Sequence, residues 1–288
     1  NQVAALTTAQ VQAFDTEQLA ALETGDIRAM TVAQAAALTS DQAAGLTTAQ
    51  VAALETLDLR AITTASFAAM TSDQIAALTT TQAANLTSAQ VAALTTAQIV
   101  GLETADLAAM TAANVVQLST ANIAELSTAQ VVAMGTAQFA SMTTAQVSAM
   151  STEQLAAIDT ADIRAMSGAQ LASLDTAQIS SLTADQMAAI DTLDLRSLST
   201  ASVEALTTEQ LVALGTGGIR GLTTTQFQAL TSEQLSNLST TQVAALETAS
   251  IRAISTAEFA ALTSDQVTAF TSTQMGGFST DQMAALTL

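Results

Sequence analysis

A repeat of eight residues constrains this chain more than any other feature. Large apolar residues recur every eight positions, beginning with Leu6, Phe14 and Leu22, and the series is still in register at Phe278 and Leu286. We number this octapeptide from the large apolar residue. Position two is Thr, Ser, Glu or Asp almost throughout, and position five is most often Gln. Position six is mostly Val, Ile or Leu, and positions seven and eight are mostly small. A period this short indicates a repeat architecture.

One continuous helix does not fit this period. A helix turns about 100° per residue, so eight residues overshoot two turns by roughly 80° and the apolar stripe would spiral around the axis. Holding the stripe on one seam would need about 4.0 residues per turn, beyond the roughly 3.67 of right-handed supercoils. Each octapeptide therefore has to form its own element.

The residues at positions two and five predict that this element is a short helix. A Thr or Ser at position two is followed three residues later by Gln, as in Thr47 with Gln50 and Ser151 with Gln154. This is the spacing of a capping box, in which the first side chain accepts a backbone N–H and the second reaches back. Every octapeptide thus carries its own helix start.

Such short helices are stable only when they pack against neighbours. Position six lies three residues before the next position one, so pairs such as Ile99 and Leu102 share one helical face. We therefore predict an all-α solenoid of very short capped helices, one per octapeptide. The alternative is a β-solenoid, since Thr, Val and Ile suit strands, but apolar spacings of five and three do not match the strand period of two.

The repeat predicts a single array over residues 1–288, because 288 residues correspond to 36 lengths of eight and composition marks no second domain. Neither end resembles the polar terminal units that normally cover a solenoid. Placed end to start, the two termini form one complete octapeptide. The sequence therefore predicts a continuous array or copies stacked head to tail, a contact that yields an open filament. The residues of this end-to-end junction are Asn1, Gln2, Val3, Leu286, Thr287 and Leu288.

Composition argues against several functions. The chain has no His or Cys, and its basic residues are all Arg, so a Ser–His triad, a thiol nucleophile, a Schiff base and a zinc site are not available. We predict that the protein is not an enzyme and needs no cofactor. The net charge of −19 disfavours binding to nucleic acid, which is itself negatively charged. Thr and Gln interrupt every apolar run, so no membrane insertion is expected.

The six arginines mark a variant of the repeat. Arg always occupies position seven, usually with an acid at position two and often another at position five. Three pairs are separated by 32 residues, which suggests duplication of a four-unit block and a coil that returns after about four units. Two interpretations are open. We favour solvated surface pairs worth about 0–1 kcal/mol each, and the other interpretation is ion pairs that set the register between coils or subunits. The residues are Arg28, Arg60, Arg164, Arg196, Arg220 and Arg252.

The acids of this variant are the candidates for a cation. Carboxylates are ligands that Ca²⁺ accepts, and rows of negative charge gain from divalent ions. We expect calcium as the one possible bound ion, at the residues Glu23, Asp26, Glu55, Asp58, Asp159, Asp162, Asp191 and Asp194.

Glycines interrupt the pattern at residues 215–218 and 276–277. A phosphate-binding loop would need a Lys or a strand-to-helix context, and neither is present. We expect local loosening or close backbone packing at these positions.

The acidic, Cys-free unit of the Leu-Thr-Thr-Ala-Gln type, seen at residues 94–98, resembles the repeat regions of very large bacterial secreted and surface proteins. The resemblance implies an extracellular or cell-surface location. It suggests a structural protein in a filament, sheath, surface layer or biofilm matrix fibre that associates with itself. One alternative is the stalk of a giant adhesin, and another is a solenoid whose Thr rows bind ice or a surface.

Overall fold

The computed structural model describes residues 3–286 as a succession of short helices joined by extended corners, and no strand occurs within that range. A 3₁₀ helix at Val3–Ala5 precedes the α-helices, which are four to seven residues long. The predicted all-α solenoid is confirmed, and the β-solenoid is wrong. The contacts divide the chain after Ala149 into two compact units, which are described one at a time. The single array over residues 1–288 stays a prediction.

The helices of the first unit are α1 Thr8–Gln12, α2 Thr16–Ala20, α3 Thr24–Arg28, α4 Val32–Ala36, α5 Ser40–Gly45, α6 Thr48–Ala53, α7 Thr56–Ala61, α8 Thr64–Ala68, α9 Ser72–Ala76, α10 Thr80–Ala84, α11 Ser88–Ala92, α12 Thr96–Gly101, α13 Thr104–Ala109, α14 Ala112–Val115, α15 Thr120–Glu125, α16 Thr128–Ala133, α17 Thr136–Ser141 and α18 Thr144–Ser148.

Those of the second unit are α19 Thr152–Ala157, α20 Thr160–Ala165, α21 Gly168–Ala172, α22 Thr176–Ser181, α23 Ala184–Ala189, α24 Thr192–Leu195, α25 Thr200–Glu204, α26 Thr208–Ala213, α27 Gly215–Gly221, α28 Thr224–Gln228, α29 Ser232–Ser236, α30 Thr240–Ala245, α31 Thr248–Ala253, α32 Thr256–Ala260, α33 Ser264–Ala269, α34 Ser272–Met275 and α35 Thr280–Ala285.

The helices begin where the sequence predicts. Thr47 has extended backbone angles and its hydroxyl accepts the N–H of Gln50 at 3.2 Å, while the Gln50 Oε1 accepts the N–H of Thr47 at 2.8 Å. Position one ends the preceding helix, because residues such as Leu102 are themselves extended, with φ −66° and ψ 129°. At such a corner two extended residues in succession, here Leu102 and Glu103, turn the chain, so neither Gly nor Pro is needed to stop the helix.

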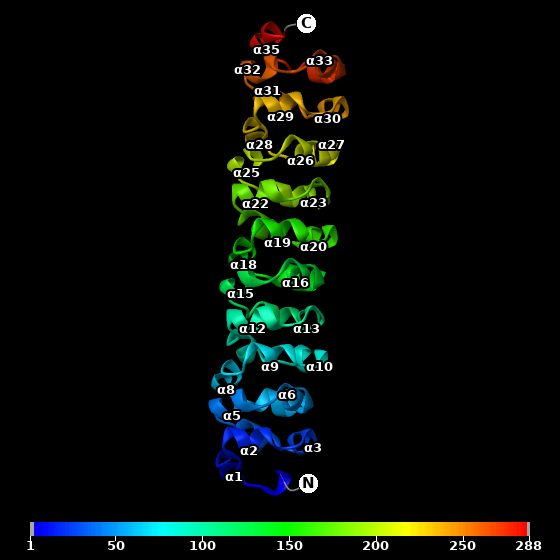
Figure 1. Cartoon of the computed structure of the whole chain (residues 1–288). Coiled ribbons are helices and arrows are strands. Elements are labelled where there is room, and N and C mark those ends of the chain that lie inside the picture. The colour runs from blue at the N-terminus through cyan, green and yellow to red at the C-terminus, as the bar shows by residue number, and fades with distance from the viewer. Residues whose placement is uncertain (1–2, 287–288) are drawn as a thin grey trace. The chain divides into compact units, whose positions relative to one another are not determined.

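Three octapeptides make one coil. In the first unit α9 packs on α12, and α10 packs on α13, as Figure 1 shows. In the second unit α23 packs on α26 in the same way. Each helix therefore lies on the one three octapeptides away, and each unit has three columns of stacked helices. The predicted return after about four units is wrong.

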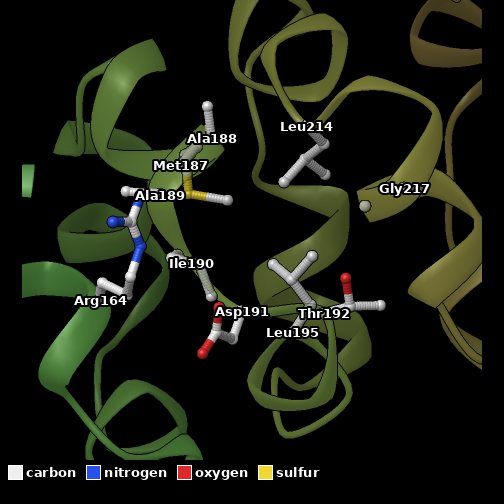
Figure 2. A pocket seen from close by; sticks show the side chains of 11 residues that line it. Arg164, Met187, Ala188, Ala189, Ile190, Asp191, Thr192, Leu195, Leu214 and Gly217 are labelled. Carbon is white, nitrogen blue, oxygen red and sulfur yellow. The ribbon is translucent and has the colours of Figure 1, made fainter.

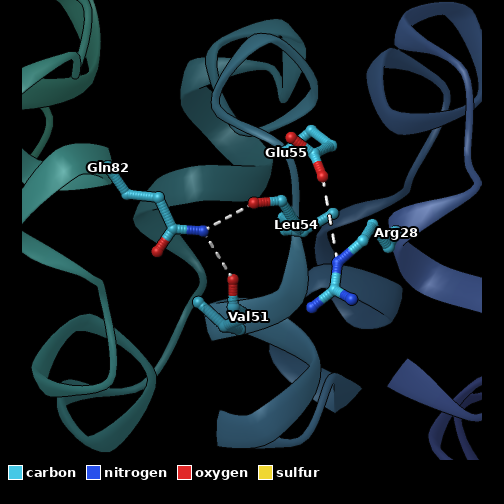
Figure 3. A network of polar contacts seen from close by, with 5 residues as sticks. All are labelled: Arg28, Val51, Leu54, Glu55 and Gln82. Carbon is cyan, nitrogen blue, oxygen red and sulfur yellow. Dashed lines mark hydrogen bonds and ion pairs between the residues drawn. The ribbon is translucent and has the colours of Figure 1, made fainter. Parts of the chain in front are cut away.

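Position five joins one coil to the next. The Gln82 amide nitrogen Nε2 donates to the backbone carbonyls of Val51 and Leu54 at 2.9 and 2.8 Å (Figure 3). The Gln82 Oε1 atom accepts the N–H of Thr79. One side chain thus caps its own helix and binds the corner of the coil below. Because Gln82 is only 2% exposed, these hydrogen bonds are shielded from water.

Positions six and one form the core. Val51 and Leu54 are both buried, and the same pair of positions is buried in nearly every octapeptide. Larger side chains gather in the second unit, where the Phe278 ring packs edge-on against Phe259 and Phe270 with centroids 4.9 and 5.0 Å apart. The interior of each unit is therefore a narrow column of aliphatic and phenyl groups.

Candidate interaction sites

The predicted calcium ligands occupy helix starts. Each pair places one acid at position two and another at position five, as in Glu55 and Asp58 at α7. Glu55 makes no capping hydrogen bond, in contrast to the Thr of other units. The same holds for Glu23, Asp159 and Asp191. Among residues 3–286, no three acidic, His or Cys side chains come together as a metal cluster.

The buried carboxyl of Asp106 is a feature that the sequence reasoning missed. Asp106 also stands at position five, but it is 1% exposed, and its Oδ2 atom has no hydrogen-bond partner. Burial raises the pKa of Asp106, a hydrogen bond from Thr80 lowers it in part, and the negative charge of Glu103 raises it further. Burial and the charge of Glu55 likewise raise the pKa of Asp58. These carboxyls hold a proton more firmly than an exposed Asp does.

The asparagines at position five show what Asp106 lacks. Asn114 is its near-isostere, and its Nδ2 donates to the carbonyl of Leu86, 28 residues earlier, at 2.8 Å. Its Oδ1 accepts the Ser88 hydroxyl at 3.4 Å. In the same way, one carboxyl oxygen of Asp106 accepts a hydrogen bond from the Thr80 side chain. By this equivalence the unpartnered oxygen of Asp106 faces the carbonyl of Leu78. Two acceptors then oppose each other unless a proton lies between them.

The arginines make one ion pair. Arg28 Nε lies 3.8 Å from Glu55 Oε1 in the adjacent coil, with the two side chains 63% and 61% exposed (Figure 3). The other five arginines form no ion pair with any carboxylate in the described part of the chain. An exposed pair of this kind contributes about 0–1 kcal/mol.

Two arginines bind backbone instead. Arg196 Nε donates to the carbonyl of Gly221 at 3.0 Å, and Arg252 Nε donates to that of Gly277 at 2.8 Å, each 25 residues further along the chain. Both glycines stand at position eight and pack tightly on the coil below, where a Cβ at Gly277 would lie 2.1 Å from a methyl carbon of Thr248. These arginines therefore join successive coils without a carboxylate.

Threonine hydroxyls form columns on the surface. At position two they are engaged as caps. Several of those at position three are exposed, although the Thr80 hydroxyl also binds the Asp106 carboxyl. Thr80, Thr104 and Thr128 begin the stacked helices α10, α13 and α16, and all three are exposed. The column repeats once per coil, at the spacing of packed helices, which is about 8–10 Å.

Of the predicted end-to-end junction, only Val3 and Leu286 belong to the described part. Val3 is 5% exposed and Leu286 is partly buried. Asn1, Gln2, Thr287 and Leu288 lie outside the described residues.

A cleft of about 300 Å³ opens where the repeat is broken at α27. There Gly215 replaces the capping Thr and has φ +61°, and Gly218 replaces the Gln of position five. Leu214 is helical instead of extended, so α26 runs almost directly into α27. Figure 2 shows Arg164 and Asp191 on one side of this cleft and Leu214 on the other. The glycine cluster has open space around Gly215 and Gly217 and close packing at Gly218, where a Cβ would lie 2.8 Å from Leu214 Cβ.

The described residues thus define an all-α repeat solenoid, the class in which each unit contacts only its neighbours and stability accumulates along the array. No helix within residues 3–286 combines the length and the apolar character that crossing a bilayer requires.

Eight segments of the chain match the ALTTAQ repeat family, and the chain belongs to that family. No curated protein sequence matches the chain. The matched segments overlap and are residues 19–56, 51–88, 99–136, 128–158, 155–192, 187–224, 211–240 and 237–272.

Proposed function

We propose that the protein is a structural element of a long extracellular assembly such as a filament, sheath, surface layer or biofilm matrix fibre. The observation that carries this proposal is the repeated corner hydrogen bond. Gln50, Gln82 and Gln130 each bind two carbonyls of the coil below at 2.8–2.9 Å. A device that is repeated along the array supports mechanical continuity and not one localised reaction.

The chemistry of the surface supports the same role. Without His, Cys or Lys, the repeat offers only carboxylates, hydroxyls, amides and a few guanidinium groups. An acidic exterior keeps separate copies soluble through their mutual repulsion. A few apolar side chains interrupt it, and Leu57 and Leu193 are 65% and 75% exposed. Such side chains are the points at which copies could contact one another.

The experiment is light scattering after size exclusion, over protein concentrations from about 1 μM to about 1 mM, combined with electron microscopy of the same fractions. We expect mass to rise with concentration and fibres to appear at the upper end, because a heterologous contact does not close. Calcium and chelator arms test whether a divalent ion promotes assembly.

A matched pair of variants sharpens the test. Leu286→Asp places a charge at the predicted junction and is expected to lower the assembled mass, whereas the exposed Thr96→Ala leaves it unchanged. A monodisperse monomer at every concentration, from a gene that encodes no further repeats, would overturn the filament proposal. Elongated monomers joined to a different domain would instead support the stalk of an adhesin.

A further inference from the structure

The cleft at α27 lies between two octapeptides, those of α26 and α28, whose position five is Gln. Gln210 at α26 donates through Nε2 to the carbonyls of Ile179 and Leu182 at 2.9 and 2.6 Å. These acceptors are 31 and 28 residues before it, the separations that Gln82 and Gln130 also show. The next octapeptide has Gly218 at the same position, so its corner receives no side chain.

The acceptors of that corner are nevertheless in place. Counting back 31 and 28 residues from Gly218 gives Met187 and Ile190, and both line the cleft. The Met187 carbonyl accepts the N–H of Ile190 at 3.3 Å, the bond that closes the helix end in the other units as well. No side chain among residues 3–286 donates to either carbonyl. A carbonyl oxygen has two lone pairs, so each can accept a further donor.

Charged groups stand at the rim of the same cleft. Arg164 and Asp191 belong to the lining, and Figure 2 shows them on the same side as Ala189 and Ile190, with Leu214 and Gly217 opposite. The cleft therefore combines backbone acceptors, a guanidinium donor and one apolar wall. A ligand that fits must carry N–H donors and an acceptor close together.

We propose that this cleft binds a primary carboxamide. Its NH₂ group donates to the carbonyls of Ile190 and Met187, as Gln Nε2 does at the other corners, and its oxygen accepts from Arg164. The acceptors are fixed by the fold before the ligand arrives, so little ordering opposes binding. The carboxamide comes from a small molecule or from a Gln or Asn side chain of another protein, and the experiment distinguishes these sources.

The test uses the full ¹⁵N-labelled chain and propionamide as the probe, followed by nuclear magnetic resonance. We expect saturable shifts confined to the amides of residues 187–195 and 214–218, with a dissociation constant in the millimolar range. N,N-Dimethylpropionamide keeps the oxygen but has no N–H, and it is expected to bind at least about tenfold more weakly, a difference of about 1.4 kcal/mol. A tripeptide with a central Gln, compared with its Ala analogue, tests the second source.

Two variants locate the contacts. Arg164→Ala leaves the cleft open but removes the donor, and it should weaken propionamide binding several-fold. Gly215→Thr with Gly218→Gln restores the regular octapeptide and should abolish binding. Both positions change together because a Cβ at Gly218 alone would lie 2.8 Å from Leu214 Cβ. Should that double variant fail to fold, Arg164→Ala and the dimethyl probe still decide.

A gain of site provides the positive control. Gln210→Ala uncovers the carbonyls of Ile179 and Leu182 and should create a second propionamide site beside them. Tighter binding of the Gln peptide than of propionamide would assign the ligand to a protein side chain, and binding of propionamide alone would assign it to a small molecule. Absence of saturable shifts, or equal binding of the dimethyl probe, would overturn the proposal and leave a cleft filled with water.

Discussion

Asp106→Asn is expected to stabilise the protein at neutral pH. The wild-type Oδ2 atom is buried without a partner and, by comparison with Asn114, faces the carbonyl of Leu78. Asparagine places an NH₂ group there, and Asn114 and Asn122 make the equivalent bonds at 2.8 and 2.9 Å. The substitution therefore converts an opposed pair of acceptors into a hydrogen bond.

The magnitude follows from two contributions. A hydrogen bond between buried groups is worth about 0.5–1.5 kcal/mol net, and relieving an unsatisfied buried group about 1–3 kcal/mol. Because these contributions overlap, we expect the free energy of unfolding of Asp106→Asn to exceed that of wild type by about 2 kcal/mol. This is a gain that few surface substitutions give.

The gain should depend on pH. The pKa of Asp106 is raised in the folded state, so the folded protein binds the proton more tightly than the unfolded chain. The stabilisation of wild type that comes from this proton is complete below the unfolded pKa and is lost as pH rises through the folded pKa. Wild type and Asp106→Asn should thus converge in acid, where the neutral carboxyl donates to Leu78, and diverge above the folded pKa.

The assay is urea denaturation followed by circular dichroism from about pH 3.5 to 8. Asp73→Asn on α9 is the control, because Asp73 is exposed and its loss removes the same single charge. The control should shift stability by no more than about 0.5 kcal/mol. A destabilised Asp106→Asn protein, or a difference that stays constant with pH, would refute the reasoning.

Three other predictions follow from the corners, the core and the surface. Gln130→Met keeps the volume of the side chain but removes its donor to the carbonyls of Ile99 and Leu102. We expect the free energy of unfolding, measured by urea denaturation, to fall by about 2–4 kcal/mol, whereas Gln117→Met at an exposed position should leave it nearly unchanged. Leu94→Asp introduces an unpaired charge at a position where the side chain is only 5% exposed. The variant should lose the helical far-ultraviolet circular dichroism spectrum near room temperature, while Thr96→Ala should retain it. Similar tolerance at both positions would mean that the wrong face of the helix has been placed inside. Arg28→Ala should lower the free energy of unfolding by at most a few tenths of a kcal/mol at low salt, and by nothing measurable at about 1 M salt, when measured by urea denaturation. A larger loss would indicate that the aliphatic part of the Arg28 side chain packs on the neighbouring coil.

The helix starts could be predicted from the sequence because a capping box is local. Thr47 and Gln50 lie three residues apart, and their reciprocal hydrogen bonds need no knowledge of the rest of the chain. The core could be predicted for a similar reason, since Ile99 and Leu102 share a face within one helix turn.

The number of octapeptides per coil could not be predicted in this way. Every octapeptide presents the same corner, so the repeat alone does not say which earlier corner a Gln reaches. The 32-residue spacings between arginines favour four octapeptides per coil. In the structure, however, Arg28 binds Glu55 in the next coil, 27 residues further on, and the helices that carry Arg28 and Arg60 do not stack on each other. The spacing of Gln from Thr predicts only that Gln caps its own helix, and it gives no sign that Nε2 also binds the coil below.

For the same reason, the sequence does not reveal two of the corners that lack an amide at position five, those of Asp106 and Gly218. With position five regarded as a cap, Asp106 resembles one more surface acid, and no Arg follows it at position seven, where Ala108 stands. Gly218 was noticed for its backbone freedom and not for the amide it lacks. A position-by-position comparison would have identified both residues once the donor role of position five was known.

The three-helix coil sets two different step lengths for change in this chain. An inserted octapeptide brings its own cap, its own core pair and its own corner, so the bonds that reach 28 and 31 residues back can re-form with the new neighbours. Everything after the insertion is, however, moved to the next column of helices. The array can therefore lengthen by any number of octapeptides. Side chains aligned along one column of helices, however, stay aligned only when octapeptides are inserted in multiples of three. Arg28 on α3 and Arg60 on α7 are separated by a whole number of octapeptides, but that number is not a multiple of three, so the two residues lie in different columns.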